Sequence, residues 1–434
     1  MRLILGTHHF SSLGGSETYL LTIAEQLERL GHDVVIFASE VGEMADLAAA
    51  RGIRVTAALA ALPEECDGVL SQDAVSALVL AERYPHQPLV FVVHGAGREL
   101  MVPPQLPGVV SAAVVMNDRV RERVEAMAAG HEVMRLRQPI DSDRFTTRVP
   151  IREQPRRLLL LGNNLRGLRK EMILSVCEEL GLECLQVGRH GQARADPEIA
   201  INGADIVMGY GRSVLEGMAC GRAAYVFDHL GGDGWVTRER YPVLEADGFG
   251  GRVDNDVIDT ERLRRDLRCY EPEMGLANRD LVVHEHDANR HAQAIANAFE
   301  RLAPRSPLMA PLAEMARLVR LQWQSDSRAG MLAVENEILT RQSRDEQERL
   351  AHEHDQLTRE HELLALEQER RARSELERQL ELVASLQNEN AQVYAELDRV
   401  RQELATLKST RRYKVAGGIA APLDFARSRG NRRL

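Results

Sequence analysis

Cysteine, aromatic side chains and long apolar runs are scarce in this chain of 434 residues. None of the five cysteines belongs to a C-x-x-C pair and no secretory leader precedes them, so we expect reduced thiols rather than a disulfide framework. No stretch reaches the ~20 apolar residues that span a bilayer. Because the first six residues have the pattern of a strand rather than of a signal peptide, the sequence favours a cytoplasmic protein.

Glycine and proline are nearly missing between about Gln324 and Thr410, where Glu, Arg, Gln and Leu dominate. Residues up to about Arg301 instead combine short apolar runs with Gly and Pro. This change in composition predicts a globular part followed by a helical extension. The net charge of −10 is spread along the chain without a basic face, so nucleic acid is not an expected partner.

Apolar runs with strand and helix spacing alternate in the globular part. A buried run at 3–5 is followed by a polar loop and by apolar residues at helical spacing, and the same order restarts at 158–161. The sequence therefore predicts an α/β fold with two Rossmann-like domains, at 1–150 and 151–301, that face a cleft. Ligands of such sheets bind at the carboxyl ends of the strands.

Helical periodicity of a different kind marks the extension. A helical linker is expected over 302–330 and a coiled coil over 331–410, with an a/d seam in 383–407. We expect a homodimer through this seam, and Asn390 at an a position favours a parallel, in-register pair; a single solvated helix is the alternative. The seam consists of Val383, Leu386, Asn390, Val393, Leu397, Val400, Leu404 and Leu407.

Basic residues dominate the last segment, 411–434, where they are interleaved with apolar side chains. Such a segment is suited to peripheral contact with an anionic inner membrane surface. A disordered basic end is the alternative.

Gly14 and Gly15 stand between the first strand and the first helix. Glycines let a phosphate or sugar approach the backbone, and the N–H groups at a helix start attract an anion. The alternative is a tight turn in which Ser16 caps the helix.

Four further motifs follow in a fixed order. They are Leu30-Gly31-His32-Asp33-Val34, Val93-His94-Gly95, Arg137-Gln138-Pro139-Ile140-Asp141 and Val214-Leu215-Glu216-Gly217-Met218-Ala219-Cys220-Gly221. Together with the two glycines they cover about residues 1–300 and resemble the family 4 retaining glycosyltransferases. The last motif is the most specific of them.

The resemblance implies the GT-B fold and a sugar-transfer reaction. The reaction implied is transfer of a sugar, with retention of anomeric configuration, from a nucleotide-diphosphate donor to a saccharide or lipid-linked acceptor in bacterial-type surface-glycan synthesis. No cofactor and no metal is expected, because the family resembled binds its diphosphate without metal and no His/Cys/Asp cluster has metal-ligand spacing.

Glu216 opens a helix after a strand and a Gly-containing loop, so its carboxylate can accept two hydrogen bonds from a ribose diol. Capping of the helix is the alternative role. By resemblance Glu216 is the second Glu of an E-x7-E motif. The first Glu position holds Met208, which puts the activity itself in question.

Basic and glycine-rich loops complete the expected site. By resemblance, the loop around Arg169 grips the diphosphate, a His at the end of a strand contacts the sugar, and Gly231-Gly232 form a loop at sugar and diphosphate. A solvated basic loop, a structural histidine and a flexible turn are the respective alternatives. The expected catalytic residues are His94, Arg169 and Lys170; the expected donor-binding residues are Gly14, Gly15, Asn163, Arg166, Arg212, Glu216, Gly231 and Gly232.

Two other functions are compatible with the sequence. A catalytically degenerate domain could bind a sugar nucleotide or glycan and act as a coiled-coil scaffold, which Met208 favours. A sugar-nucleotide epimerase of the same fold is disfavoured by the motif around Glu216. His8 and His9, at the end of the first strand, are weaker candidates for acceptor contact.

Overall fold

The structure is a computed structural model. It describes residues 1–409 with the exception of 96, 98, 128–129, 189–195, 230, 255–256 and 308–311. The basic segment 411–434, for which membrane contact is expected, lies outside the described residues.

The first domain contains a seven-stranded parallel sheet with the strand order β3-β2-β1-β4-β5-β6-β7. The order reverses at β1, so the loop after β1 lies at a topological switch point. The strands are β1 (Arg2–Phe10), β2 (Asp33–Val41), β3 (Arg54–Thr56), β4 (Gly68–Ser71), β5 (Leu89–Val93), β6 (Ala112–Val115) and β7 (Glu132–Arg135).

Alternate residues of β1 enter two different cores. Leu3 and Leu5 pack with α1 and α2, whereas Ile4 packs with α3 and α4 on the opposite face. A strand buried on both faces explains the unbroken apolar run in the sequence. The helices are α1 (Gly15–Arg29), α2 (Glu43–Ala50), α3 (Ala74–Arg83) and α4 (Asp118–Glu125), and two 3-10 turns are η1 (Leu59–Ala61) and η2 (Glu99–Met101).

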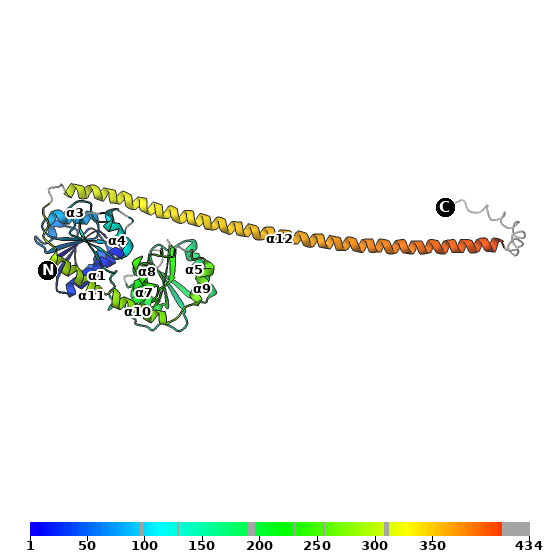
Figure 1. Ribbon diagram of the computed structural model, residues 1–434, viewed down its shortest axis with the longest axis horizontal. Helices are drawn as coiled ribbons and strands as arrows, with labels where there is room; N and C mark the ends of the chain where they lie inside the picture. Colours follow the sequence, from blue (N-terminus) through cyan, green and yellow to red (C-terminus); the bar gives the residue numbers. More distant parts are fainter. Residues whose placement is uncertain are drawn as a thin grey trace. The chain divides into compact units, whose positions relative to one another are not determined.

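The second domain contains a five-stranded sheet with the order β12-β11-β10-β8-β9, in which only β12 is antiparallel. Helices α6 to α8 cover one face and α5 and α9 the other (Figure 1). The strands are β8 (Arg157–Leu161), β9 (Glu183–Val187), β10 (Ile206–Gly209), β11 (Ala223–Asp228) and β12 (Gly231–Trp235). The helices are α5 (Leu168–Glu179), α6 (Pro197–Gly203), α7 (Arg212–Ala219), α8 (Tyr241–Ala246), α9 (Thr260–Arg268) and α10 (Glu273–Glu285).

The chain then returns to the first domain. Helix α11 (Ala288–Arg301) packs against α1, and its residues Ile295 and Phe299 belong to the core of the first sheet. The expected second domain, 151–301, thus ends with a helix that is part of the first domain. At the crossing, Ile140 pairs with Asp287 in a parallel bridge.

Helix α12 (Leu312–Ser409) is 98 residues long and divides between two compact units, 1–343 and 344–434. The sequence predicts only a linker over 302–330. In the structure, described residues on either side of 308–311 pack on the first domain instead: Arg305 donates hydrogen bonds to backbone carbonyls, and Ala316 and Trp323 are buried. The apolar side chains of this segment thus pack against the first domain, a contact that helical spacing in the sequence does not reveal.

These observations confirm the predicted α/β class with two Rossmann-like domains and a long C-terminal helix. All five cysteines are free thiols. Within the described ranges, no helix combines the length and the apolar character needed to cross a bilayer.

Candidate functional site

A pocket of about 370 Å³ lies between the two Rossmann-like domains, where the carboxyl ends of their strands meet. The loop after β1 and helices α1 and α2 supply one wall, and the loops after β8 and β9 with the start of α7 supply the other. Both β1 and β8 are positions at which the strand order of their sheet reverses. This is the place where open α/β sheets bind their ligands.

The wall from the first domain contains the predicted glycine pair. Gly14 is the N-cap of α1 and Gly15 its first residue, and both line the pocket. A Cβ at Gly15 would meet nothing within 4 Å, so the backbone is open to the pocket at this point. The first N–H groups of a helix have no partner within the helix, and they favour an anion.

Glu17 adds an acid to this helix start. Burial raises the pKa of its carboxyl, and Oε2 accepts a hydrogen bond from the Ser16 hydroxyl at 2.9 Å. The helix start therefore places backbone donors and a carboxyl group with a raised pKa within one turn.

The opposite wall carries Glu216, which is 7% exposed, and Arg212 one turn before it on α7. Nε of Arg212 donates to Oε1 of Glu216 at 2.8 Å. The same guanidinium donates to the carbonyl of Pro139 at 2.9 Å and to Oγ1 of Thr22 on α1 at 3.2 Å. Arg212 thus joins the second domain to the first at the pocket.

The electrostatics of this pair follow from its burial. Burial raises the pKa of Glu216, while Arg212 and Arg144 oppose that rise. Burial also lowers the pKa of Arg212, and Glu216 counteracts it. A guanidinium remains charged in proteins, so the pocket holds a cation with a carboxylate beside it.

Of the predicted basic loop, Gly162 and Asn163 line the pocket, whereas Arg166, Arg169 and Lys170 are not among the lining residues. Nη1 of Arg169 donates to the carbonyl of Asp228 at 3.1 Å, and its guanidinium lies 5.5 Å from the centre of the Phe227 ring. Arg169 is therefore directed to the end of β11 in this structure.

Gly231 and Gly232 lie on the edge strand β12 rather than in a loop at the pocket. A Cβ at Gly232 would stand 2.5 Å from the Phe227 ring and 2.6 Å from Ile258, so the missing side chain permits close packing. A run rich in glycine suggests a loop in the sequence, but pairing with β11 and burial fix it as a strand.

Met208 occupies the position at which the family motif has its first Glu. It lies on β10, is 1% exposed, and packs in the core between the second sheet and helices α5 and α9. A side chain there does not reach the pocket.

His94 follows β5 and is not a pocket-lining residue, but it is close enough to the pocket-lining Arg212 for that charge to affect its pKa. Its Nε2 lies 2.8 Å from Oε1 of Gln72, and its ring stacks edge to face on Tyr19, with the ring centres 4.9 Å apart. Burial is the main cause that lowers the pKa of His94 to about 3, and Arg212 and His291 contribute to the same shift. The imidazole is therefore neutral at pH 7.

No family model matches the chain, and no curated protein matches its sequence. Solved structures with a similar fold exist. They include HepE of Anabaena in complex with UDP and glucose, with 12% identity over 70% of this chain and 100% of that chain and a TM-score of 0.47. Others are MurG of Acinetobacter baumannii (15% identity, 69% and 99% coverage, TM-score 0.41) and CalG4, the calicheamicin glycosyltransferase (12%, 70% and 99%, 0.41). At these identities and scores the likeness does not assign a function to this chain.

Three further residues of the pocket are not singled out by sequence reasoning as site residues. Arg144 lines it, pairs with Glu198 at 3.0 Å and lies over the Phe145 ring. Thr22 and Glu43 come from α1 and α2. Arg144 closely follows the motif that begins at Arg137, and this is the one feature of the sequence that could have indicated its role in the site. No feature of the sequence indicates Thr22 and Glu43, because their helices show only amphipathic spacing.

Proposed function

We propose that this protein transfers a sugar from a nucleotide-diphosphate donor to a saccharide or lipid-linked acceptor, with retention of anomeric configuration, in surface-glycan synthesis. The observation that carries the proposal is a single pocket that combines the start of α1 with the buried Arg212–Glu216 pair. A ribose diol matches a carboxylate acceptor, and a diphosphate matches a helix start and guanidinium groups.

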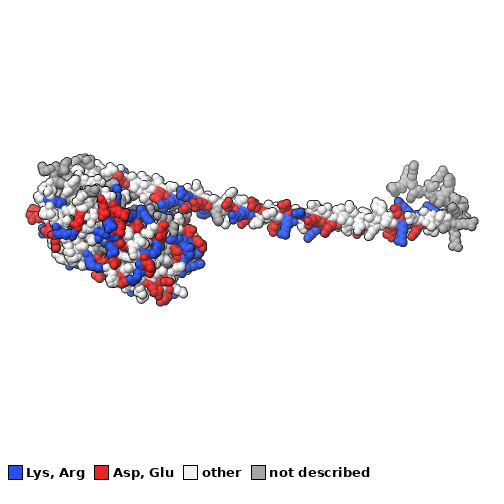
Figure 2. All heavy atoms as spheres, in the orientation of Figure 1, with Lys and Arg blue, Asp and Glu red and all other residues white. Residues whose placement is uncertain are grey.

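In the proposed complex Glu216 accepts hydrogen bonds from the ribose hydroxyls, and Asn163 lies at the neighbouring loop. Arg212 and Arg144 supply positive charge in the pocket wall, where a leaving diphosphate gains most from fixed cations because little water surrounds them. On the face drawn in Figure 2, Lys/Arg and Asp/Glu side chains are interspersed over residues 1–343. That face offers no surface of a single charge sign, so we assign selectivity for a polyanionic donor to the cations of the pocket.

Arg169, Lys170 and His94 keep their proposed catalytic roles in a donor-bound state. Arg169 has to leave the carbonyl of Asp228 to reach the pocket, and a bound diphosphate supplies the charge that favours this movement. His94, neutral and directed by Gln72, donates or accepts a hydrogen bond without adding charge.

A direct test uses calorimetry with UDP, GDP, ADP and dTDP, followed by assays of sugar transfer and of donor hydrolysis with the matching nucleotide sugars. We expect one nucleotide diphosphate to bind with one site per chain and its sugar derivative to be consumed. The anomeric signal of the first product by NMR tests retention. Binding of no nucleotide diphosphate would overturn the donor assignment.

A second candidate is a scaffold that binds a sugar nucleotide without turnover. It is favoured by Met208, whose core position leaves the pocket without the first acid of the family motif. Tight nucleotide binding without either transfer or hydrolysis would support this function over the first.

We also propose that the helical extension forms a homodimer. Its seam residues are exposed in the single chain: Val383 is 49% exposed, Leu397 43% and Leu407 58%. Acidic and basic side chains follow α12 with uncharged stretches between them (Figure 2). A second copy would cover the apolar seam and leave the charges in solvent, as in coiled coils.

A further inference from the structure

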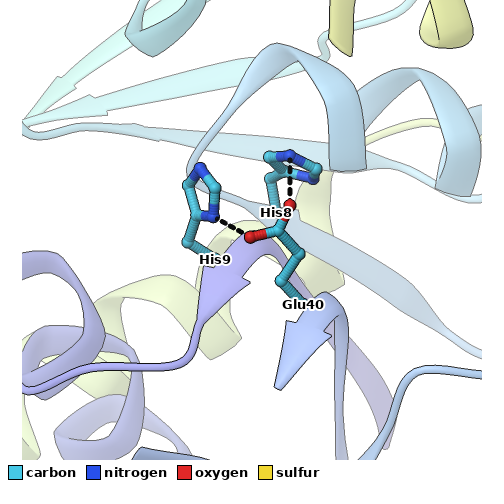
Figure 3. Close-up of side chains that lie close together, drawn as sticks. All are labelled: His8, His9 and Glu40. Carbon is cyan, nitrogen blue, oxygen red and sulfur yellow. Dashed lines mark hydrogen bonds and ion pairs between the residues drawn. The ribbon is translucent and has the colours of Figure 1, made fainter. Parts of the chain in front are cut away.

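His8 and His9 lie near the end of β1 in the first domain, and Glu40 lies beside them on β2 (Figure 3). The parallel register places His9 opposite Glu40. Nδ1 of His9 lies 2.8 Å from Oε2 of Glu40, and Nε2 of His8 lies 3.6 Å from Oε1 of the same carboxylate. One carboxylate therefore stands between two imidazoles.

The His8 side chain is 1% exposed, and neither of its ring nitrogens has a hydrogen-bond partner among the described residues. Burying a polar nitrogen without a partner costs free energy, and such groups in folded proteins nearly always have one. The backbone holds the ring in place, because the N–H of His8 donates to Oδ2 of Asp73 at 2.6 Å. The His8 ring therefore offers a fixed nitrogen atom that is suited to bind a ligand.

We propose that His8, His9 and Glu40 form a binding site for a divalent transition-metal ion, with Zn²⁺ as the best match. One ligand atom from each residue falls within a group whose members lie within 4.8 Å of one another. Tetrahedral Zn²⁺ with bonds near 2.0–2.1 Å separates its ligand atoms by roughly 3.3 Å. The separations of 2.8 Å between His9 Nδ1 and Glu40 Oε2 and of 3.6 Å between His8 Nε2 and Glu40 Oε1 lie within about half an ångström of that value, and the ligand atoms of the two imidazoles lie within 4.8 Å of each other.

The protonation and mobility of the three side chains fit a metal. Burial is the main cause that lowers the pKa of His8 to about 4, so this imidazole keeps its lone pair at pH 7. The Glu40 side chain is 46% exposed and can shift to open its contact with His9. Two imidazoles and one carboxylate form a set that Zn²⁺ uses with a further open position.

Groups from other elements surround the site. Trp323 of α12 lies against both imidazoles, with ring centres 5.4 Å from each. Asp73 and Glu17 are acids near His9, whereas Arg320 of α12 adds positive charge near His8. Arg320 opposes a cation, which predicts that its removal strengthens binding.

A bound ion would hold the ends of β1 and β2 together, and Trp323 of α12 would lie against the two imidazoles that bind it. The site lies beside the pocket wall, because the carbonyl of Ser11, two residues after His9, accepts a hydrogen bond from the N–H of the pocket residue Glu43 at 3.0 Å. The role assigned to the metal is to stiffen this wall. It is separate from the donor diphosphate and does not depend on the sugar-transfer proposal.

The test uses the full-length chain with Trp235→Phe, which leaves Trp323 as the only tryptophan. Titration with CoCl₂ should quench Trp323 fluorescence to saturation at one ion per chain, because a paramagnetic ion quenches an adjacent ring. Excess ZnCl₂ should restore the emission, and MgCl₂ should have no effect, since Mg²⁺ prefers oxygen ligands. Quenching that does not saturate, or that ZnCl₂ does not reverse, would overturn the site.

Variants at the two ligands outside the core, the half-buried His9 and the exposed Glu40, locate the ion without disturbing the core. His9→Gln and Glu40→Gln should each weaken Co²⁺ binding by at least about tenfold. Arg320→Gln should tighten it. The matched control is His284→Gln, a surface histidine whose Nδ1 lies 3.1 Å from Asp280, and it should leave the titration unchanged. Equal effects of the control and of Glu40→Gln would refute the proposal.

Discussion

Replacing Glu216 by Gln is the sharpest test of the donor pocket. The change keeps the size and shape of the side chain and removes its negative charge. Glu216 is 7% exposed and accepts a hydrogen bond from Arg212 at 2.8 Å, so the amide would remain within the same packing. What disappears is the charged acceptor proposed for the ribose diol.

The expected loss follows from the worth of a hydrogen bond to a charged group, about 1.5–3 kcal/mol. Because about 1.4 kcal/mol corresponds to a factor of ten, the dissociation constant of the nucleotide diphosphate should rise by roughly 10- to 150-fold. The protein should also lose about 1–3 kcal/mol of stability, since Arg212 stays buried beside a neutral partner.

Calorimetry with the nucleotide diphosphate that binds the wild type gives the affinity, and urea denaturation gives the stability. Glu245→Gln is the matched control. Glu245 is 6% exposed, accepts hydrogen bonds from Arg135 at 2.7 and 2.9 Å, and is not a pocket-lining residue. Both variants should lose stability, but only Glu216→Gln should lose affinity; an unchanged dissociation constant in folded Glu216→Gln would refute the ribose assignment.

Three other outcomes are expected. Changing Arg169 and Lys170 together to Ala should lower sugar transfer by on the order of a hundredfold while nucleoside affinity stays nearly constant, and equal losses in kinetics and calorimetry would contradict a role at the leaving diphosphate. Deleting residues 344–434 should convert a dimer into a monomer by light scattering, and a monomeric full-length chain at micromolar concentration would contradict the seam. In urea denaturation, the free energy of unfolding should fall from pH 6.5 towards pH 5 by about 1.4 kcal/mol per pH unit for each of the buried His286 and His291. Burial lowers their pKa values in the folded state to about 3 and about 4, below the unfolded value of 6.5, so only the unfolded chain takes up these protons. A flat profile would show that these imidazoles become protonated in the folded state.

The sheets were accessible from sequence because their strands are continuous apolar runs. A parallel strand covered on both faces has no polar alternation, and Leu158 to Leu161 illustrate this with neighbours in two different cores. The location of Glu216 was also accessible, since a strand, a glycine loop and a helix start together place its side chain at the end of the sheet.

The other features of the fold and the site could not be predicted, because they depend on contacts between elements that are far apart in the sequence. The spacing of α11 shows an apolar face but not which sheet covers it, and the glycines at 231–232 show freedom of conformation but not the edge strand that uses it. His9 and Glu40 are 31 residues apart, so only the register of β1 against β2 brings them together. Patterns of local residue spacing cover much shorter separations, so they could not predict this pair.

The return of α11 makes the second domain an insertion within the first. Its two connections are side by side: the N–H of Ile140 donates to the carbonyl of His286 at 2.7 Å, and the N–H of Ala288 donates to the carbonyl of Ile140 at 3.2 Å. Because these two hydrogen bonds tie the connections together, we expect them to act as one hinge. Twisting the domains against each other should break the hydrogen bonds, whereas opening and closing of the cleft should preserve them. We therefore expect the cleft to open along one direction, which the backbone at these two connections sets.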